Sequence, residues 1–223
     1  MNTELTLYGY WRSSAAYRVR IALNLKGLAY QQVPVHLVKD GGQQRSAEYQ
    51  ALNPQELLPL LVDKGNGGVR IAQSLAIFEY LDEVFPAPAL LPSDAALRAQ
   101  VRALALHIAC DLHPLNNLRV LQYLSGELGV DEAAKDAWYQ HWLHKGLAAV
   151  EAGMAVFNDR LSLGERPGYL EACLVPQLYN ARRFNCDLDA YPRTYPRILA
   201  MAARCDSLDA FTQAAPEVQP DAQ

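Results

Sequence analysis

The sequence predicts an α/β N-terminal domain followed by an all-α C-terminal domain. Alternating apolar residues, typical of strands, occur in the first part of the chain between segments with helical spacing, whereas the strong patterns after residue 95 are helical only. A proline-rich connector, FPAPALLPSD at 85–94, separates the two regions. We therefore expect domains at 1–87 and 93–223, in a chain long enough to bury a sizeable core.

The N-terminal elements are expected in the order β-α-β-β-β-α. The strands are predicted at 5–11, 31–37, 57–63 and 69–71, and the helices at about 14–26 and 72–85. Gly27 is expected to end the first helix, and KGNGG between the last two strands indicates a hairpin. This order fits a small thioredoxin-like domain with helices packed on a four-stranded sheet. Pro59 lies where a strand begins, and a cis Leu58–Pro59 bond would accommodate it.

The C-terminal part is expected to form a helical bundle. Its strongest helical segments are predicted at 95–112, 131–157 and 169–184. Pro114 and Pro176 are expected to bend or interrupt helices.

Composition and charge exclude several function classes. A net charge of −4 provides no basic field for nucleic acid or anionic lipid. The chain has no signal-peptide pattern and no apolar run of about 18 residues, so we expect a cytoplasmic protein without a membrane partner. The histidines form no credible metal set, and we expect no metal. Four widely spaced cysteines without a CxxC pair are expected to be buried thiols, namely Cys110, Cys173, Cys186 and Cys205.

Two helix starts are candidate anion sites. Ser13 and Ser14 lie where the first strand ends and a helix begins, between Arg12 and Arg18. A helix N-terminus favours a bound anion, and a thiolate would be such an anion, although the serines could instead serve only as caps. Gln73 and Ser74 begin a later helix, where a ligand carboxylate and simple capping are both consistent with the pattern. A serine nucleophile is disfavoured because no GxSxG elbow is present.

Two polar clusters interrupt the apolar helices of the C-terminal part. Asn116, Asn117 and Arg119 lie in HPLNNLRVL, and they either pair within the bundle or face a cleft. Of the adjacent Arg182 and Arg183, one is expected to be solvated while the other could point inward.

Taken in series, several motifs resemble the zeta class of glutathione transferases, which includes the maleylacetoacetate isomerases. The most specific are the SSxxxRVRIALxLKG pattern within RSSAAYRVRIALNLKGL, the QSLAIxEYL pattern within AQSLAIFEYL, and LVPQ with RRF in the C-terminal part. KDGGQQ, ALNPQELLPLL and HPLNNL add to them, so that the resemblance runs over nearly the whole chain. It implies a thioredoxin-like domain that binds glutathione, a helical domain that supplies most of the second-substrate pocket, and a homodimer.

The resemblance also assigns roles to individual residues. Ser13 would stabilise the glutathione thiolate, with Ser14 and the Ala15 amide completing the helix-end site. Arg12 and Arg183 would face the carboxylates of an acidic substrate, because arginine suits bidentate carboxylate recognition. The remaining glutathione contacts would come from Gln44, the Leu58 backbone before Pro59, Gln73, Ser74, His113, Asn117 and Arg119.

The implied reaction is a cis–trans isomerisation of a small unsaturated dicarboxylic keto acid, with maleylacetoacetate converted to fumarylacetoacetate in aromatic catabolism. The glutathione thiolate would add to the double bond, the resulting single bond would rotate, and elimination would return glutathione. Maleylpyruvate is a second substrate candidate; a conjugating transferase or peroxidase and a non-catalytic module are further alternatives. The chain departs from the family pattern at Ala15, where a cysteine is usual, and at Tyr17, where a tryptophan is usual. Gly168 and Glu171 replace the usual capping box ahead of LVPQ, so we expect that helix to survive with a weaker start.

Overall fold

The computed structural model describes residues 4–156, 167–186, 188 and 195–222, and the chain divides into two compact units. The first unit contains Met1–Leu90 together with Ser207–Gln223, and the second contains Leu91–Asp206. The sequence pattern placed everything from 93 to 223 in the helical domain. The structure instead packs residues 207–223 with the N-terminal unit.

The first unit is built on a four-stranded mixed sheet with the strand order β2-β1-β3-β4. β1 is parallel to β2 and antiparallel to β3, and β3 is antiparallel to β4. Leu7 and Leu61 are paired across β1 and β3 and are fully buried. The thioredoxin-like fold predicted from the sequence is confirmed. The first three strands are shorter than expected and the fourth is one residue longer: β1 Leu5–Gly9, β2 Tyr30–Pro34, β3 Leu60–Asp63 and β4 Val69–Ala72.

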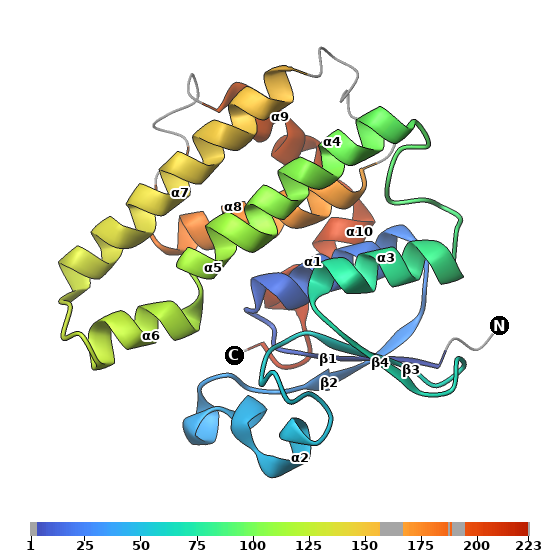
Figure 1. Ribbon diagram of the computed structural model, residues 1–223, viewed down its shortest axis with the longest axis horizontal. Helices are drawn as coiled ribbons and strands as arrows, with labels where there is room; N and C mark the ends of the chain where they lie inside the picture. The colour runs from blue at the N-terminus through green and yellow to red at the C-terminus, as the bar shows by residue number, and fades with distance from the viewer. Residues whose placement is uncertain (1–3, 157–166, 187, 189–194, 223) are drawn as a thin grey trace. The chain divides into compact units, whose positions relative to one another are not determined.

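Helices cover both faces of this sheet. α1 (Ser14–Leu25) and α3 (Ser74–Val84) lie side by side on one face, and the short α2 (Ala47–Gln50) lies on the other (Figure 1). α1 buries nine of its residues, which explains why it follows its predicted bounds so closely. Gly27 ends this helix with a φ of 64°, and the Leu28 N–H donates to the Leu23 carbonyl at 2.9 Å, as in a Schellman cap.

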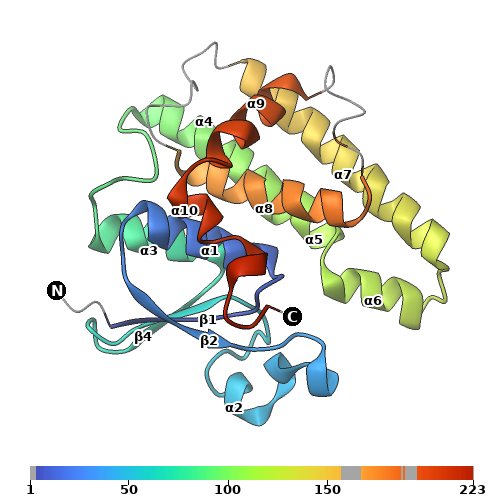
Figure 2. The ribbon, with the colours of Figure 1, turned by 180° about the vertical axis from the view of Figure 1, so that it is seen from behind.

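The C-terminal segment adds a further layer beside α1. α10 (Asp209–Thr212) and a 3₁₀ turn at Pro216–Val218 run along this helix (Figure 2). The Asn24 side chain donates to the Ala210 carbonyl at 3.0 Å, and Phe211 and Ala214 are buried. Sequence periodicity could not indicate this segment, because a four-residue helix has too few positions to show a repeat.

Where the structure describes it, the second unit consists of helices and their connections, as predicted. α8 (Tyr169–Arg183) is buried along most of its length and packs against α4 (Ala95–Leu106) and α9 (Pro196–Cys205). A π-helix at His107–Leu112 continues α4, followed by α5 (His113–Leu115), α6 (Leu118–Gly126) and α7 (Glu132–Ala155).

The sequence led to expectations for two prolines and for one helix start in the helical unit. α8 continues through Pro176, and Pro114 lies in the first turn of α5, where the missing N–H is tolerated; neither proline interrupts its helix. α8 begins after Gly168, whose N–H donates to Glu171 Oε2 at 2.9 Å, so the helix keeps half of a capping box. Burial raises the pKa of the Glu171 carboxyl.

The expectation for the cysteines was partly wrong. Cys173, Cys186 and Cys205 are buried, but Cys110 in the π-helix is exposed. Burial raises the pKa of the Cys205 thiol to about 12 and that of Cys186 to about 11, so both thiols stay protonated at neutral pH.

No helix within the described ranges is long and apolar enough to cross a membrane. Among the same described residues, no group of three or more His, Cys, Asp or Glu side chains could hold a metal ion.

A buried ion pair ties α1 to α3. Lys26, whose side chain is fully buried, places its Nζ 2.6 Å from Asp82 Oδ1 and donates to the Pro88 carbonyl at 2.7 Å. Asp82 also accepts from the Leu90 N–H at 3.0 Å. The pair therefore joins the end of α1 to α3 and to the connector that follows.

We expect Lys26→Ala to lower the free energy of unfolding by about 3 kcal/mol, because it leaves the Asp82 carboxylate without its cation. Lys135→Ala is the matched control. Lys135 pairs with Glu132 at the same 2.6 Å, but the Glu132 side chain is 79% exposed, so the expected loss is about 0.5 kcal/mol. Urea unfolding of both variants tests this difference. Equal losses would contradict it.

Candidate active site

The predicted serine pair lies at the start of α1, in the first unit. A turn at residues 10–13 leads into the helix, closed by the Ser13 N–H donating to the Tyr10 carbonyl at 2.9 Å. Ser13 is the N-cap, and its Oγ accepts from the Ala16 N–H at 3.2 Å. Ser13 and Ala15 are half-buried, while Ser14 is buried. The capping interpretation is thus correct for Ser13, and its hydroxyl hydrogen remains available for a ligand.

The electrostatics of this helix start favour an anion. The first turn of α1 contains no acidic residue that would neutralise the positive end of the helix dipole. The half-buried Arg12 immediately precedes the cap. Its guanidinium lies 4.5 Å from the centre of the Trp11 ring and donates to the Tyr10 hydroxyl from Nη2 at 3.0 Å. These two aromatic residues hold a cation beside the helix end.

The second predicted site lies at the start of α3. Ser74 is buried, and its Oγ accepts from Nη1 of the buried Arg18 at 3.3 Å, which links α1 to α3. Gln73 is exposed and has a φ of 70°, a conformation that non-glycine residues rarely adopt. Its Nε2 donates to Gln55 Oε1 at 2.7 Å. Backbone strain of this kind is concentrated at ligand sites, where the surrounding structure maintains it.

The loop before β3 presents the expected cis peptide bond. The bond between Leu58 and Pro59 is cis. The preceding Leu57 carbonyl accepts from the Tyr49 hydroxyl at 2.7 Å and from the Asn53 side chain at 2.8 Å. Within the described residues no protein group hydrogen-bonds the Leu58 N–H or carbonyl. This peptide is therefore free to pair with an extended ligand backbone.

Gln44 is less accessible than the sequence suggested. It is buried, its Nε2 makes a long hydrogen bond of 3.4 Å to the Leu37 carbonyl, and its Oε1 has no partner among the described residues. The neighbouring Gln43 accepts from the His36 N–H at 2.9 Å and so closes the loop. A ligand N–H donor would satisfy the buried Gln44 oxygen.

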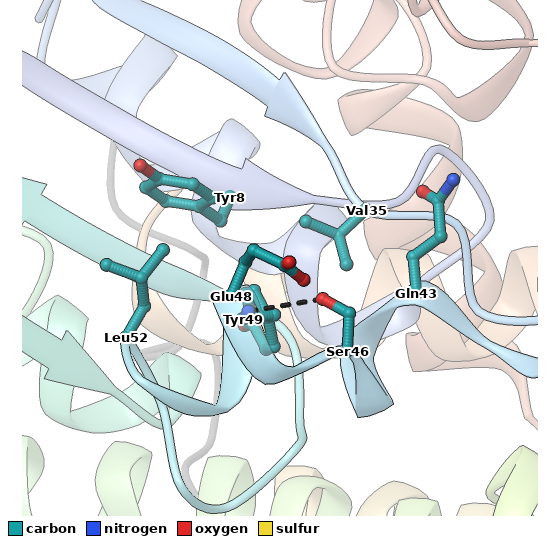
Figure 3. Close-up of a pocket in the computed structure, with 7 residues that line it drawn as sticks. All are labelled: Tyr8, Val35, Gln43, Ser46, Glu48, Tyr49 and Leu52. Carbon is teal, nitrogen blue, oxygen red and sulfur yellow. Dashed lines mark hydrogen bonds between the residues drawn. The ribbon is translucent and has the colours of Figure 1, made fainter.

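A pocket of about 370 Å³ lies between the sheet and the α2 region (Figure 3). Two tyrosine rings, Tyr8 and Tyr49, line it together with Val35, Leu52, Gln43, Ser46 and Glu48. None of these seven residues belongs to the predicted site, so this pocket is separate from the candidate ligand positions at α1 and α3.

Of the predicted polar residues at 113–119 in the second unit, Asn116 is hydrogen-bonded to α7, and the others lie in α5 and at the start of α6. The buried Asn116 donates to the Tyr139 carbonyl at 3.5 Å, and Trp138 Nε1 donates to the Leu115 carbonyl at 2.8 Å. Asn117 is the N-cap of α6, with its Oδ1 accepting from the Arg119 N–H at 3.0 Å. His113 is half-buried at the start of α5, and the Arg119 side chain is exposed.

The two adjacent arginines at the end of α8 are both exposed. The expectation that one could point inward is therefore wrong. The Arg183 guanidinium lies 5.3 Å from the Phe184 ring, which stacks on Tyr139 at 4.0 Å. Burial raises the pKa of the Tyr139 hydroxyl. Arg183 thus has an aromatic platform that orients it while leaving it open to a solvent-borne anion.

Arg18 reaches the Ser74 hydroxyl, which links the helix that begins at Ser13 and Ser14 to the start of α3. Four residues that support the candidate site were not predicted from the sequence: Tyr10 and Trp11 beside Arg12, Asn53 at the Leu57 carbonyl, and Gln55 at the Gln73 side chain. Only the aromatic pair YW directly before Arg12 was a usable sequence signal, since an arginine often stacks on a neighbouring ring.

Comparison with known proteins agrees with this architecture. Residues 3–83 match the family model of the glutathione S-transferase N-terminal domain. A protein of Vibrio cholerae called a probable maleylacetoacetate isomerase is 53% identical, over 98% of this chain and 99% of its own length.

Two solved structures are similar over almost the full chain. One is a maleylpyruvate isomerase in its holo form, described as a bacterial zeta-class glutathione transferase; it has a TM-score of 0.89, 47% identity, and coverage of 98% of this chain and 100% of its own. The other is the maleylacetoacetate isomerase of Anaeromyxobacter dehalogenans with glutathione bound in its active site. Its TM-score is 0.85 at 41% identity, with 100% of this chain and 99% of the other covered.

Proposed function

The chain belongs to the zeta class of glutathione transferases, and we propose that it is a glutathione-dependent isomerase converting maleylacetoacetate to fumarylacetoacetate in aromatic catabolism. The observation that carries this proposal is the half-buried Ser13 hydroxyl at the N-terminus of α1. The names of the relatives support the substrate class, and the glutathione bound to a similar structure supports the cofactor.

The groups of the first unit fit the chemistry of glutathione. Ser13, Ser14 and the Ala15 amide would hold the sulfur at the positive end of α1. Ser74 already accepts a hydrogen bond from Arg18, so its own hydrogen is left to donate to the γ-glutamyl carboxylate beside Gln73.

The rest of the tripeptide would be held by the loop before β3 and by Gln44. The Leu58 peptide before Pro59 would pair with the cysteinyl backbone as a short added strand. The buried Gln44 oxygen would accept from a ligand N–H.

Bound glutathione supplies the thiol whose anion adds to the substrate double bond and later leaves it. Ser13 would donate a hydrogen bond to the sulfur, and the helix end would lower the pKa of the thiol, so that the proton is lost before the substrate arrives. The side chain of residue 15 contributes no thiol of its own because it is alanine.

Cationic groups would hold the acidic substrate. Arg12 and Arg183 would bind carboxylates, and with Arg119 they would stabilise the negative charge that develops on the substrate during addition. His113 and Asn117 would add contacts to glutathione, not to the substrate. The Asn117 oxygen caps α6, which leaves its amide nitrogen as a donor.

A second substrate, maleylpyruvate, is supported by the likeness to a maleylpyruvate isomerase and by the Arg119 side chain in the HPLNNLR run. Turnover of both acids with and without glutathione discriminates between the two. We expect glutathione to be required and kcat/KM to be higher for maleylacetoacetate. A higher kcat/KM for maleylpyruvate would make maleylpyruvate the preferred substrate. If conjugating or peroxidase turnover were dominant, the protein would be a transferase or peroxidase and not an isomerase. Weak glutathione binding in a calorimetric titration would instead indicate a non-catalytic module.

The proposal includes a cytoplasmic homodimer, supported by the resemblance to the family. Sedimentation velocity tests the dimer, and a monomer at working concentration would contradict it.

We expect Ser13→Ala to lower turnover at pH 7 about 30-fold while glutathione still binds. Without the hydroxyl, the pKa of the bound thiol should return toward about 8.5, which leaves a few per cent of thiolate at pH 7. Because a higher pH restores the thiolate, the loss should shrink as the pH rises above that value. Unchanged turnover at neutral pH would contradict the role of Ser13.

Ser46→Ala is the matched control for this experiment. Ser46 caps α2 as Ser13 caps α1, and its Oγ accepts from the Tyr49 N–H at the same 3.2 Å. The control should cost about 1 kcal/mol of stability, as loss of a cap does, and leave the pH profile unchanged.

We expect Arg183→Ala to raise KM for the dicarboxylic substrate about tenfold or more, because a charge-assisted hydrogen bond contributes about 1.5–3 kcal/mol. Arg182→Ala removes an equally charged, equally exposed neighbour and should leave KM unchanged. Steady-state kinetics at saturating glutathione measure both variants. Equal effects would show that only the net charge of this helix end matters.

A further inference from the structure

The last residues of the chain hold the turn that precedes Ser13. Asp221 Oδ2 accepts from the Trp11 N–H at 3.1 Å, across 210 positions of sequence. On the other side of the same residue, Arg20 Nη2 donates to the Trp11 carbonyl at 3.0 Å. Both backbone polar groups of Trp11 are thus bound by charged side chains.

Arg20 connects this turn directly to the C-terminal segment. Its side chain is fully buried in α1, and Nε donates to the Ala214 carbonyl at 2.9 Å. The guanidinium also lies 5.3 Å from the Tyr17 ring. A buried guanidinium needs several fixed acceptors, so the positions of Trp11 and Ala214 are linked through one rigid planar group.

The C-terminal segment is itself fixed, so Asp221 is presented in a defined place. Gln219 Nε2 donates to the Gln213 carbonyl at 3.0 Å and to the Ala215 carbonyl at 2.7 Å. Gln32 Nε2 lies 3.5 Å from the second Asp221 oxygen, so the carboxylate has a contact of its own. The Asn24 bond to the Ala210 carbonyl lies eleven residues earlier and holds α10, not this carboxylate.

The held turn is the one that leads directly into the Ser13 cap of α1. Trp11 lies between Tyr10 and Ser13, whose carbonyl and N–H close the turn at 2.9 Å. A rotation of the Trp11 peptide would turn the Ser13 cap away from the end of α1. It would also move the ring on which the Arg12 guanidinium lies.

We propose that Asp221 and Arg20 are positioning residues that hold the Trp11 peptide so that the Ser13 hydroxyl faces the bound sulfur. This inference rests on the proposed function, in which Ser13 stabilises the glutathione thiolate. In this proposal the C-terminal segment helps to keep the thiol ionised, although no residue of that segment needs to contact the ligand. Small displacements of a group that aims at a reacting atom reduce rates strongly, which is why a remote carboxylate can matter.

The test measures the pH at which glutathione ionises on the intact protein, from the ultraviolet absorbance of the thiolate. We expect Asp221→Ala to raise this midpoint by about one pH unit, equivalent to about a tenfold lower thiolate fraction when the pH lies below the midpoint. kcat measured at a pH below both midpoints should fall by the same factor, and it should recover as the pH rises above them. Asp221→Asn keeps an acceptor for the Trp11 N–H but not the charge, so we expect about half the shift.

Asn24→Ala is the matched control, because it removes an anchor of the C-terminal segment without touching Trp11. It should lower the thermal midpoint of unfolding while leaving the ionisation of glutathione unchanged. A shift in the control equal to that of Asp221→Ala would show that the segment acts only by stabilising the unit, and would overturn the proposal.

The remaining outcomes are distinguishable. An Asp221→Ala protein that ionises glutathione at the same pH as the unaltered protein overturns the inference and leaves the proposed function intact. If Asp221→Ala does not fold, an unchanged midpoint in Asp221→Asn overturns it. If the unaltered protein itself neither binds nor ionises glutathione, the proposed function fails, and the inference fails with it.

Discussion

The burial of two guanidinium groups in α1 constrains the packing of the whole first unit. Arg18 and Arg20 are 2% and 0% exposed, and a buried charge without hydrogen-bond acceptors would be costly. The acceptors must therefore come from neighbouring elements at fixed positions. Arg18 uses the Ser74 hydroxyl at the start of α3, and Arg20 uses the carbonyls of Trp11 and Ala214. One helix thus constrains the turn that precedes it and two segments that are distant in sequence.

The same arrangement explains how one unit can offer two anion positions. The N-terminal first turns of α1 and α3 carry no acidic side chain, so their partial positive charges remain uncompensated by the helices themselves. Arg18 bridges the two helix starts from within the core, and Arg12 lies beside the first on an aromatic support. A ligand with an anionic sulfur and a distant carboxylate would complement this distribution of charge, as the proposed binding of glutathione requires.

Elements with regular hydrophobic periodicity could be predicted from the sequence. Positions that depend on long-range hydrogen bonds could not. α1 and α8 were located closely because each buries a long apolar surface, and Gly27 marked a helix end by its conformational freedom. The location of residues 207–223 was not predicted, because it depends on side chains that bind remote backbone carbonyls. Every residue type carries the same carbonyl, so the sequence does not mark these acceptors. For the same reason, the bonds of Asp221 and Arg20 to the Trp11 backbone could not be predicted from the sequence.

At the candidate site, sequence located the residues but not their surroundings. Ser13 and the cis peptide at Pro59 were placed by motif and by backbone chemistry. The positive φ of Gln73 and the burial of Gln44 belong to the folded loops and are not indicated by the residue types in these segments. The exposure of Arg182 and Arg183 at the end of α8 could not be predicted either, because charge alone does not indicate whether a side chain faces solvent.

The distribution of cysteines determines which sulfur the first unit can use. All four lie between residues 91 and 206, in the second unit, and position 15 at the helix start is alanine. Burial keeps Cys186 and Cys205 protonated at neutral pH. Because the first unit contains no cysteine, no thiol of this unit can lie at the start of α1. The loss of the family's usual cysteine therefore strengthens the case that Ser13 and its helix act on the sulfur of glutathione.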